Sequence, residues 1–397
     1  MQETKKAASQ RPYAGLRVLE VGVDIDGEMT GKLLAGLGAE VTKVEPPEGA
    51  PTRCVGPFAS SGDNSEESLA FWFYNVGKRS IVVADTSWTA LLGDIDVLIC
   101  GLPPAEMNAA GIDLQRLCDL HPRLIAVAVT PFGMTGPWRN YRSSDLVGLA
   151  AAGMLNSCGY DDHSLPPIRP GGDNGYACSA SFAHIGVLLA LIDRQHSGKG
   201  QVVDVAMHDA IAVSSELANP YWFYPKVLVH RQTCRHAQPT PTQPALFRCA
   251  DGGYVYFVLM LSDPKSWAAT VDWLASVGIE VDLRDSAYGE LAHRQNSFDH
   301  IQDIVEAFFL MQNAPDVYRE GQRRGLPIGI VNAPEDLLED EHLRARKFFV
   351  EVDHEGRDPV LYPGSPWRFS AFETQPFRRA PNLGEHTEEV TRGTRVS

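Results

Sequence analysis

The feature of this sequence that most constrains its fold is a repeated alternation of short β-branched runs with helical stretches. The first run, "GLRVLEVG" at 15–22, has the unbroken apolar character of a strand buried in a parallel sheet. A helical stretch at 27–38 ends in Gly, and a second strand-like run follows at 39–45. This βαβ order predicts an α/β fold with a doubly wound parallel sheet. Further strands are expected at 79–85, 95–101, 124–130 and 201–207.

The longest apolar stretch, from Tyr176 to Arg194, predicts a helix that is buried on most sides. Ser197, Gly198 and Gly200 end it. Asp173 stands just before the stretch, after two glycines, in the position of a helix N-cap. An Asp in this position is either the residue that starts the helix or a nucleophile at the mouth of the helix. The sequence pattern alone favours the cap, because capping aspartates far outnumber catalytic ones.

The length of 397 residues exceeds that of a usual single domain, so two domains are expected. We predict a large domain at 1–222, a smaller α+β domain at 223–328, and a C-terminal part at 329–397 that returns to the large domain. The pattern of alternating strands and helices stops near the first boundary, where a Pro-rich stretch precedes a hairpin signal at 251–253. The segment "GVDIDGEMTG" after the first strand contains no GxGxxG, so the sequence lacks the dinucleotide-binding fingerprint.

Composition narrows the class of protein. The net charge of −15 opposes nucleic-acid binding, which needs a basic surface. The first residues lack the apolar core of a signal peptide, and no apolar run is long and uninterrupted enough to span a bilayer. The seven Cys include no CxxC pair, which favours reduced thiols over disulfides or a zinc site. A cytoplasmic protein without a membrane partner is expected.

Several stretches, in order along nearly the whole chain, resemble the family III CoA-transferases, also called the carnitine dehydratase/bile-acid-inducible F family. They include residues 15–53, "NVGKRSIVVAD" (75–85), "PFGMTGPW" (131–138) and "ALIDRQHSGKGQVVDVAMHDA" (190–210). The resemblance implies a Rossmann-like large domain formed from both chain ends, a small domain, and two such chains interlocked as a homodimer.

The resemblance also implies a chemistry, the transfer of CoA from an acyl-CoA thioester to a free carboxylic acid. In this family an Asp carboxylate attacks the thioester, and mixed-anhydride and aspartyl-CoA thioester intermediates follow. No metal and no permanently bound cofactor is expected, because CoA enters as part of the substrate. The identity of the acid is not readable from the sequence, although the aromatic residues of 221–224 and 254–257 hint at a bulky or apolar acyl group.

The nucleophile position is the main open point of the resemblance. Counting back fifteen residues from Leu191 places the family's catalytic Asp at Tyr176, whereas Asp173 lies three residues earlier, about one helical turn away. A small insertion or a shifted helix start would restore Asp173 to the site. We therefore take Asp173 as the candidate nucleophile, with Tyr176 as the alternative occupant of its position.

The resemblance implies CoA-binding residues in the matching motifs, with Lys78 and Arg79 as a cationic pair near the nucleotide end of CoA. The full candidate set is Ile25, Asn75, Gly77, Lys78, Arg79 and Gly133.

Two departures from the family keep other functions open. The racemases of the family carry a His–Asp pair where this chain has Ser144 and Asp145. Without that His the chain lacks the base that proton transfer at the α-carbon needs, so racemase activity is disfavoured. The stretch that often reads "AGP" is "DGE" at 26–28. The alternatives are a CoA-ester-binding member with isomerase or lyase chemistry, and a non-catalytic subunit that pairs with an Asp-bearing paralogue. His184 is expected to be a core residue, and His208 lacks a metal-ligand cluster around it.

Overall fold

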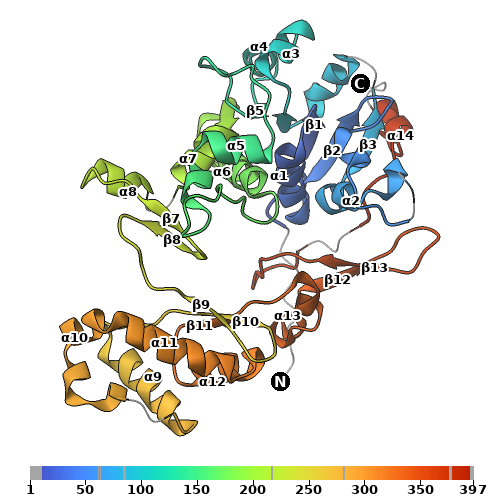
Figure 1. Cartoon of the computed structure of the whole chain (residues 1–397). Helices are drawn as coiled ribbons and strands as arrows, with labels where there is room; N and C mark the ends of the chain where they lie inside the picture. Colours follow the sequence, from blue (N-terminus) through green and yellow to red (C-terminus); the bar gives the residue numbers. More distant parts are fainter. Residues whose placement is uncertain are drawn as a thin grey trace, which may run out of the picture. The chain divides into compact units, whose positions relative to one another are not determined.

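The computed structural model of the chain describes residues 11–393, apart from 61, 63, 84, 85, 216, 217, 280, 281 and 375–377. The contacts divide the chain into two compact units (Figure 1), which we describe separately. Unit 1 comprises Met1–Met154, Pro170–Ser215 and Glu341–Ser397, and unit 2 comprises Leu155–Arg169 and Glu216–Asp340.

Unit 1 is built on a six-stranded parallel sheet with the order β3-β2-β1-β4-β5-β6. This is the order of a doubly wound sheet, in which the chain reverses its direction of travel between β1 and β4. Each predicted strand range contains one of the six strands, so the predicted α/β parallel sheet is confirmed. The strands are β1 (Arg17–Val21), β2 (Glu40–Glu45), β3 (Arg79–Val82), β4 (Val97–Cys100), β5 (Ile125–Thr130) and β6 (Val202–Ala206).

Alternate residues of the strands face two hydrophobic layers, as the period of two requires. On one face Val18 and Ile99 pack with α1 (Ile25–Gly36) and α6 (Asn174–Ser197). On the other face Leu19 packs with residues of α3 and α4. The remaining helices and strands of unit 1 are α2 (Leu69–Asn75), α3 (Pro104–Ala109), α4 (Leu114–Leu120), α5 (Asp145–Ala151), α7 (Met207–Val213), α13 (Glu341–Ala345), β12 (Phe349–Val352), β13 (Val360–Pro363) and α14 (Thr387–Gly393).

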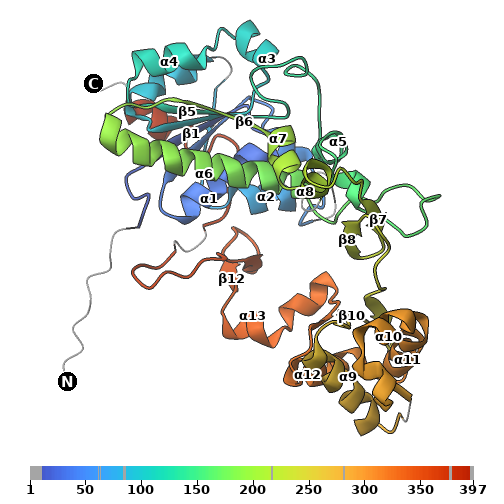
Figure 2. The ribbon, with the colours of Figure 1, turned by 90° about the vertical axis from the view of Figure 1, so that its left-hand side faces the viewer.

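Helix α6 runs along the sheet beside α1 (Figure 2) and contacts β5 and β6. Its sheet-facing residues are small, such as Ala183 and Ala190, and are buried. Its outer face, in contrast, leaves large apolar side chains 39–61% exposed, so the expectation that α6 is buried on most sides is wrong for that face. The small residues let α6 lie close to the sheet, and the large ones point outward. The exposed residues are Phe182, Ile185, Leu188, Leu189 and Ile192.

Length and composition alone would also allow α6 to span a membrane, as the one such helix in the described part of the chain. The expectation that no apolar run reaches this length is therefore corrected. Its packing against two strands of the sheet is that of a core helix of a globular unit.

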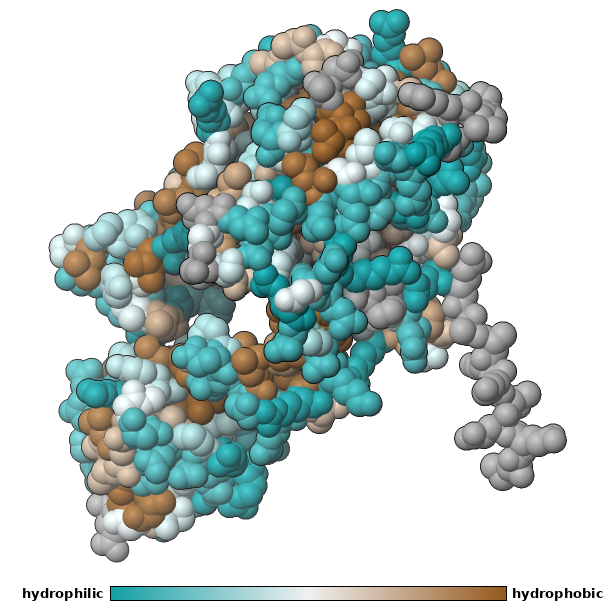
Figure 3. All heavy atoms as spheres, turned by 90° about the vertical axis from the view of Figure 1, so that its right-hand side faces the viewer, coloured by the Kyte–Doolittle hydropathy of each residue, from teal (hydrophilic) through white to brown (hydrophobic). Residues whose placement is uncertain are grey.

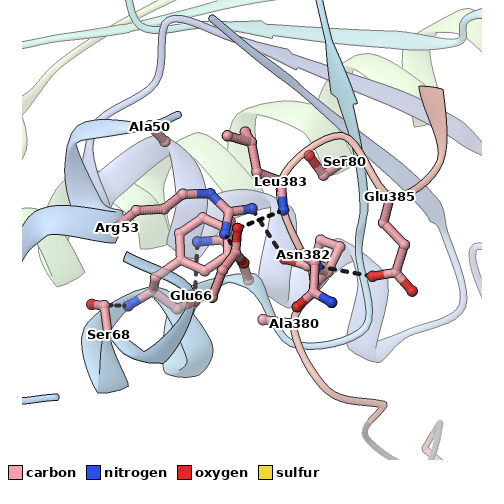
Figure 4. A network of polar contacts seen from close by, with 12 residues as sticks. Ala50, Arg53, Glu66, Ser68, Ser80, Ala380, Asn382, Leu383 and Glu385 are labelled. Atoms are coloured by element: carbon pink, nitrogen blue, oxygen red, sulfur yellow. Dashed lines mark hydrogen bonds and ion pairs between the residues drawn. The ribbon is translucent and has the colours of Figure 1, made fainter. Parts of the chain in front are cut away.

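The C-terminal segment is attached to the first half of unit 1 by a polar network (Figure 4). The Arg53 guanidinium is buried and forms two hydrogen bonds of 2.7 and 2.8 Å with the carboxylate of Glu45. It also donates to the carbonyl oxygen of Pro381 at 3.0 Å. Glu66 accepts both from Arg53 at 2.8 Å and from the backbone N–H of Leu383 at 3.1 Å. On the side of unit 1 where β3 and α14 lie, hydrophilic residues surround smaller hydrophobic groups (Figure 3).

Unit 2 has its own hydrophobic core, which among the described residues is formed by a three-stranded antiparallel sheet and three α-helices. The pairing of Tyr254 with Arg248 joins β9 to β10 across the predicted turn at 251–253, so the hairpin is confirmed. The elements are α8 (Ala218–Phe223), β7 (His230–Gln232), β8 (Arg235–Gln238), β9 (Leu246–Arg248), β10 (Tyr254–Phe257), α9 (Pro264–Ser276), α10 (Leu291–Asn296), α11 (Phe298–Leu310), α12 (Ala314–Arg323) and β11 (Ile328–Ile330).

The boundaries between the units differ from the predicted ones at 222 and 328. Unit 2 begins at Glu216, ends at Asp340, and also takes in the earlier segment Leu155–Arg169. This segment belongs there because Asp161 forms an ion pair with Arg235 of the β7–β8 hairpin, and His163 bonds to the carbonyl oxygen of Arg231 at 3.0 Å. Such contacts between distant segments cannot be predicted from the local amino-acid sequence.

Candidate functional site

The first turn of α1 and the first turn of α6 meet in unit 1 beyond the carboxyl end of β1. Ligands of open parallel sheets bind at this edge, where the strand order reverses, here between β1 and β4. The loops that leave these two strands pass very close to each other. A Cβ atom on Gly101 would lie 2.6 Å from the carbonyl oxygen of Gly22, so glycine is required there.

Asp173 occupies the N-cap position of α6, yet its side chain makes no capping hydrogen bond. The cap is supplied by Asp145, the first residue of α5, which is buried. Its Oδ1 accepts the backbone N–H groups of Gly175 at 2.7 Å and of Tyr176 at 3.3 Å. Since another carboxylate satisfies the free N–H groups of the first turn, the Asp173 side chain is released from the capping role.

The Asp173 carboxylate is instead held by a tyrosine of α2. The hydroxyl of Tyr74 donates to Asp173 Oδ2 at 3.0 Å, and the Asp173 side chain is half-buried. Burial, together with the negative charge of Asp173, raises the pKa of the Tyr74 hydroxyl above its usual value, so this hydroxyl stays a donor at neutral pH. Within the described residues, no hydrogen bond reaches the other oxygen, Oδ1.

Tyr176, the alternative occupant of the nucleophile position, is engaged elsewhere. Its hydroxyl donates to Asp24 Oδ2 at 3.1 Å, and Asp24 in turn caps α1 by accepting the N–H of Ile25 at 2.8 Å. Burial and the charge of Asp24 raise the pKa of the Tyr176 hydroxyl. A phenol that remains protonated is a poor nucleophile, so Tyr176 serves here to join α6 to the start of α1.

A further carboxyl group lies between the two helices. Asp26 is 4% exposed, and its oxygens accept from Ser179 Oγ and from the N–H of Gly27, both at 2.9 Å. Burial raises the pKa of Asp26 to about 7, an effect that the Ser179 hydrogen bond partly opposes and that the nearby charge of Asp24 adds to. The carboxyl groups of Asp24, Asp26, Asp145 and Asp173 therefore lie around the starts of α1 and α6.

Lys78 lies inside the unit rather than at its surface. Its buried ammonium group forms a 2.7 Å ion pair with Glu20 and donates to the carbonyl oxygen of Glu28 at 2.7 Å and to Asn75 Oδ1 at 3.0 Å. These partners use all three N–H groups of the lysine. The predicted phosphate contact of Lys78 is therefore not favoured by this geometry, and Asn75 likewise serves the interior.

The Lys78–Glu20 pair belongs to a buried network of two lysines and two glutamates. Lys43 pairs with Glu28 at 2.7 Å and lies 3.8 Å from Glu20. The network needs a glycine on the facing helix, because a Cβ atom on Gly31 would lie 1.6 Å from Glu20 Oε1. With equal numbers of positive and negative groups, the network holds α1 against β1 and β2 without a net buried charge.

Arg79 belongs to the other side of the sheet, so it does not form a pair with Lys78. As the first residue of β3 it pairs with Thr42 of β2, and the two line a cavity of about 240 Å³ together with Leu19 and Arg17. Leu19 packs on the face opposite α1 and α6. Arg79 is about two-fifths exposed and lies 3.7 Å from Glu389.

The other predicted contact residues are dispersed. Ile25 begins α1 and lies near Asp24 and Tyr176. Gly77 has a positive φ in the turn after α2. Gly133 turns the chain after β5, where the carboxylate of Asp204 accepts the next N–H group. Of the candidate set, Asp173 and Ile25 lie on the two helix starts that meet at the carboxyl edge of the sheet.

The histidines behave as structural groups. His184 packs between the rings of Tyr13 and Trp367, and burial lowers the pKa of its imidazole. His208 contacts Asp209 and the rings of Phe132 and Trp138. In the described part of the chain, no three His, Cys, Asp or Glu residues gather as a metal site.

Sequence reasoning did not identify Tyr74, Asp24, Asp26 or Ser179 as neighbours of the site. Two Asp residues at a helix start are typical of capping, which gave no reason to single them out. Asp145 was noted only as the partner of a missing histidine. Its cap on α6 joins segments thirty residues apart, and no local pattern indicates it.

Comparisons with a family model and with similar sequences indicate the same protein family, and a comparison with solved structures agrees in fold. The model of a family described as CoA-transferase family III matches residues 13–387. The chain is 32% identical over 383 residues to the succinyl-CoA:(R)-benzylsuccinate CoA-transferase subunit BbsE of Thauera aromatica, a match that covers 93% of this chain and 92% of that protein. It is 28% identical to the succinyl-CoA–L-malate CoA-transferase alpha subunit of Chloroflexus aurantiacus, covering 96% and 89%. The fold is that of a CaiB/BaiF family protein from Brucella suis, with a TM-score of 0.83, 24% identity, and coverage of 97% and 100%.

Proposed function

The chain belongs to CoA-transferase family III, and from that premise we propose that it transfers CoA from an acyl-CoA thioester to a free carboxylic acid with Asp173 as the nucleophile. The observation that supports this role most directly is that Asp145, rather than Asp173, caps the N-terminus of α6. Asp145 satisfies the N–H groups of the first turn, and Asp173 is left with one donor, Tyr74. A carboxylate at a helix N-terminus is stabilised in its charged, nucleophilic form by the helix dipole.

The proposed reaction proceeds through four acyl transfers. An oxygen of Asp173 attacks the thioester carbonyl carbon, CoA leaves as the thiolate, and a mixed anhydride remains. The thiolate attacks the aspartyl carbonyl carbon, which releases the donor acid and leaves an aspartyl-CoA thioester. The acceptor carboxylate attacks this thioester and expels CoA thiolate, and the thiolate then attacks the acceptor acyl carbon. The product is a new acyl-CoA, and Asp173 returns to its starting carboxylate.

The Tyr74 hydroxyl suits this sequence because it binds one oxygen and leaves the other, Oδ1, for attack. A covalent step of this kind also gains from hydrogen-bond donors that stabilise the developing oxyanion. No metal ion takes part in any step, and we propose that the chain holds no permanent cofactor.

The test is to trap the acylated enzyme. We expect an acyl-CoA donor followed by hydroxylamine to convert the Asp173 side chain to a hydroxamate, detectable by mass spectrometry of the peptide. The Asp173→Asn variant should give no trapped product and no transfer. Tyr176→Phe is the matched control, since it removes only the hydroxyl at the alternative position. Trapping that persists in Asp173→Asn would refute Asp173 as the nucleophile.

A second candidate is a non-catalytic subunit of a heteromeric CoA-transferase. The names of two similar proteins, one a "subunit BbsE" and one an "alpha subunit", favour it. So does Tyr176, which stands where an ungapped count places the nucleophile. This candidate predicts that the purified chain forms no hydroxamate and that transfer appears only after an Asp-bearing paralogue is added. Transfer by the chain alone would exclude it.

The proposal includes the assembly and location of the protein. The exposed apolar face of α6 would be covered in a homodimer, the assembly that the family implies. The partners are then an acyl-CoA and a carboxylic acid, and the protein acts in the cytoplasm. Light scattering of the purified chain tests the dimer.

A further inference from the structure

Lys32 differs from the other buried lysines of unit 1 in its lack of a counter-ion. Lys43 and Lys78 each have a carboxylate within 2.7 Å. Lys32, in the middle of α1, has no carboxylate partner and no hydrogen bond among the described residues. Buried charged groups in proteins are almost always paired, so a half-buried ammonium group without a partner calls for an explanation.

The surroundings of Lys32 do not supply the missing charge. Its ammonium group lies 3.1 Å above the ring centroid of Phe73, on α2. Such a contact stabilises the cation, but more weakly than a carboxylate would in the same surroundings. The charged group that acts on Lys32 is another cation, Lys78, which repels it. Burial, aided by Lys78, lowers the pKa of Lys32 to about 7.

A short series of contacts connects Lys32 to the candidate nucleophile. The Phe73 ring contacts the ring of Tyr74 with centroids 5.0 Å apart, and the Tyr74 hydroxyl donates to Asp173. The same helix α1 packs against both α2 and α6. The unpaired cation is therefore connected through Phe73 and Tyr74 to the Asp173 carboxylate.

We propose that Lys32 is a ligand contact that binds an anionic group, a carboxylate or a phosphate, of the CoA ester or acid that the site takes up. The inference rests on the proposed function, because it assigns the unpaired cation to the ligand of that same site. A ligand anion would supply the negative charge that Lys32 lacks among its protein neighbours. The charge of Lys32 would in turn offset the repulsion that the carboxylates near Asp173 exert on an anionic substrate.

If Lys32 binds an anion of the ligand, ligand binding is linked to proton uptake, which can be measured. When the anion arrives, it favours the protonated amine, so binding takes up a proton from solution. At pH 7.5 a lysine with a pKa of about 7 is roughly one quarter protonated, and complete charging on binding would take up about three quarters of a proton. The groups that act on Lys32 are Lys78, from the turn after α2, and the ring of Phe73 on α2. Asp26 also has a pKa of about 7, so the proton uptake that belongs to Lys32 is the part that disappears in Lys32→Met.

The experiment is isothermal titration of the full-length chain with CoA, 3′-dephospho-CoA, acetyl-CoA and succinyl-CoA, in HEPES and in Tris at pH 7.5. The variants are Lys32→Met, Lys32→Arg, and Lys265→Met as a control at an exposed lysine of unit 2. We expect Lys32→Met to weaken binding about 10- to 100-fold and to abolish the proton uptake. Lys32→Arg should retain most of the affinity without the proton uptake, and Lys265→Met should behave as the unmodified chain.

The four probes identify the source of the anion. A loss in Lys32→Met that is confined to probes with the 3′-phosphate indicates that phosphate, and an equal loss for all four indicates the pyrophosphate they share. A loss larger for succinyl-CoA than for acetyl-CoA indicates the acyl carboxylate. Equal affinities of Lys32→Met and the unmodified chain for all probes would overturn the inference alone. If the unmodified chain binds none of them, the proposed function fails with it.

Discussion

The substitution Lys78→Met separates two roles for this lysine, the phosphate contact that the motif implied and the interior ion pair in the structure. In the structure the Lys78 ammonium is 2.7 Å from Glu20, and both side chains are fully buried. Methionine fills a similar volume without the charge, so Glu20 would lose its nearest cation. The carboxylate could then be relieved only by Lys43, 3.8 Å away, which is already paired with Glu28.

The size of the effect follows from this geometry. Removing one partner of a buried ion pair costs about 3–5 kcal/mol, because a charge is left without compensation. The remaining contact with Lys43 places the expected loss near the lower end, about 3 kcal/mol of the free energy of unfolding of unit 1. In the double variant Glu20→Gln with Lys78→Met no charge is stranded, so most of the loss should be recovered.

Urea unfolding of unit 1, followed by near-ultraviolet circular dichroism, measures these differences in one buffer. CoA affinity, measured at low temperature where all variants are folded, should be the same for Lys78→Met as for the unmodified chain. If instead Lys78→Met is fully stable but binds CoA esters more weakly, and the deficit grows as salt is lowered, the interior role is refuted and the phosphate clamp stands.

Three further predictions follow from the same unit. The raised pKa of Asp26, about 7 against 3.8, means that the folded state holds the extra proton between about pH 4 and pH 7, so stability falls as pH rises through that window, by on the order of 4 kcal/mol. Asp26→Asn should flatten this slope in denaturation series at pH 5 and pH 8, and identical slopes would contradict it. Gly31→Ala should lower the melting temperature by several degrees because its Cβ would collide with Glu20, whereas Gly36→Ala in the same helix, with open space around it, should not. If the outer face of α6 forms the proposed homodimer interface, Leu189→Glu should give monomers in light scattering, and an unchanged dimer mass would exclude that face as the interface.

The sheet could be predicted from the sequence because each buried strand is a local signal. Runs such as "LIAVAVT" combine β-branched residues with a length typical of strands, and the six strands fall inside the six predicted ranges. The start of α6 was also readable, since Pro, Gly and Asp173 precede a long apolar run. These features depend on neighbours within a few residues along the chain.

The candidate site could be predicted only in part, because its contacts join distant segments. Lys78 looked like a surface cation, as its partner Glu20 lies 58 residues away. Asp173 looked like a helix cap, since nothing nearby indicates that Asp145 performs that task. The resemblance to a family supplied the candidate residues. The structure assigned several of them, Lys78 and Asn75 above all, to the interior.

The network around Arg53 has a consequence for how the protein is made. Its last hydrogen-bond partners, the backbone groups of Pro381 and Leu383, are synthesised 328 residues after Arg53 and 317 residues after Glu66, respectively. Until they emerge, a buried guanidinium and the Glu66 carboxylate in the first sixth of the chain lack part of their contacts. Unit 1 therefore remains incomplete until the whole of unit 2 has been synthesised.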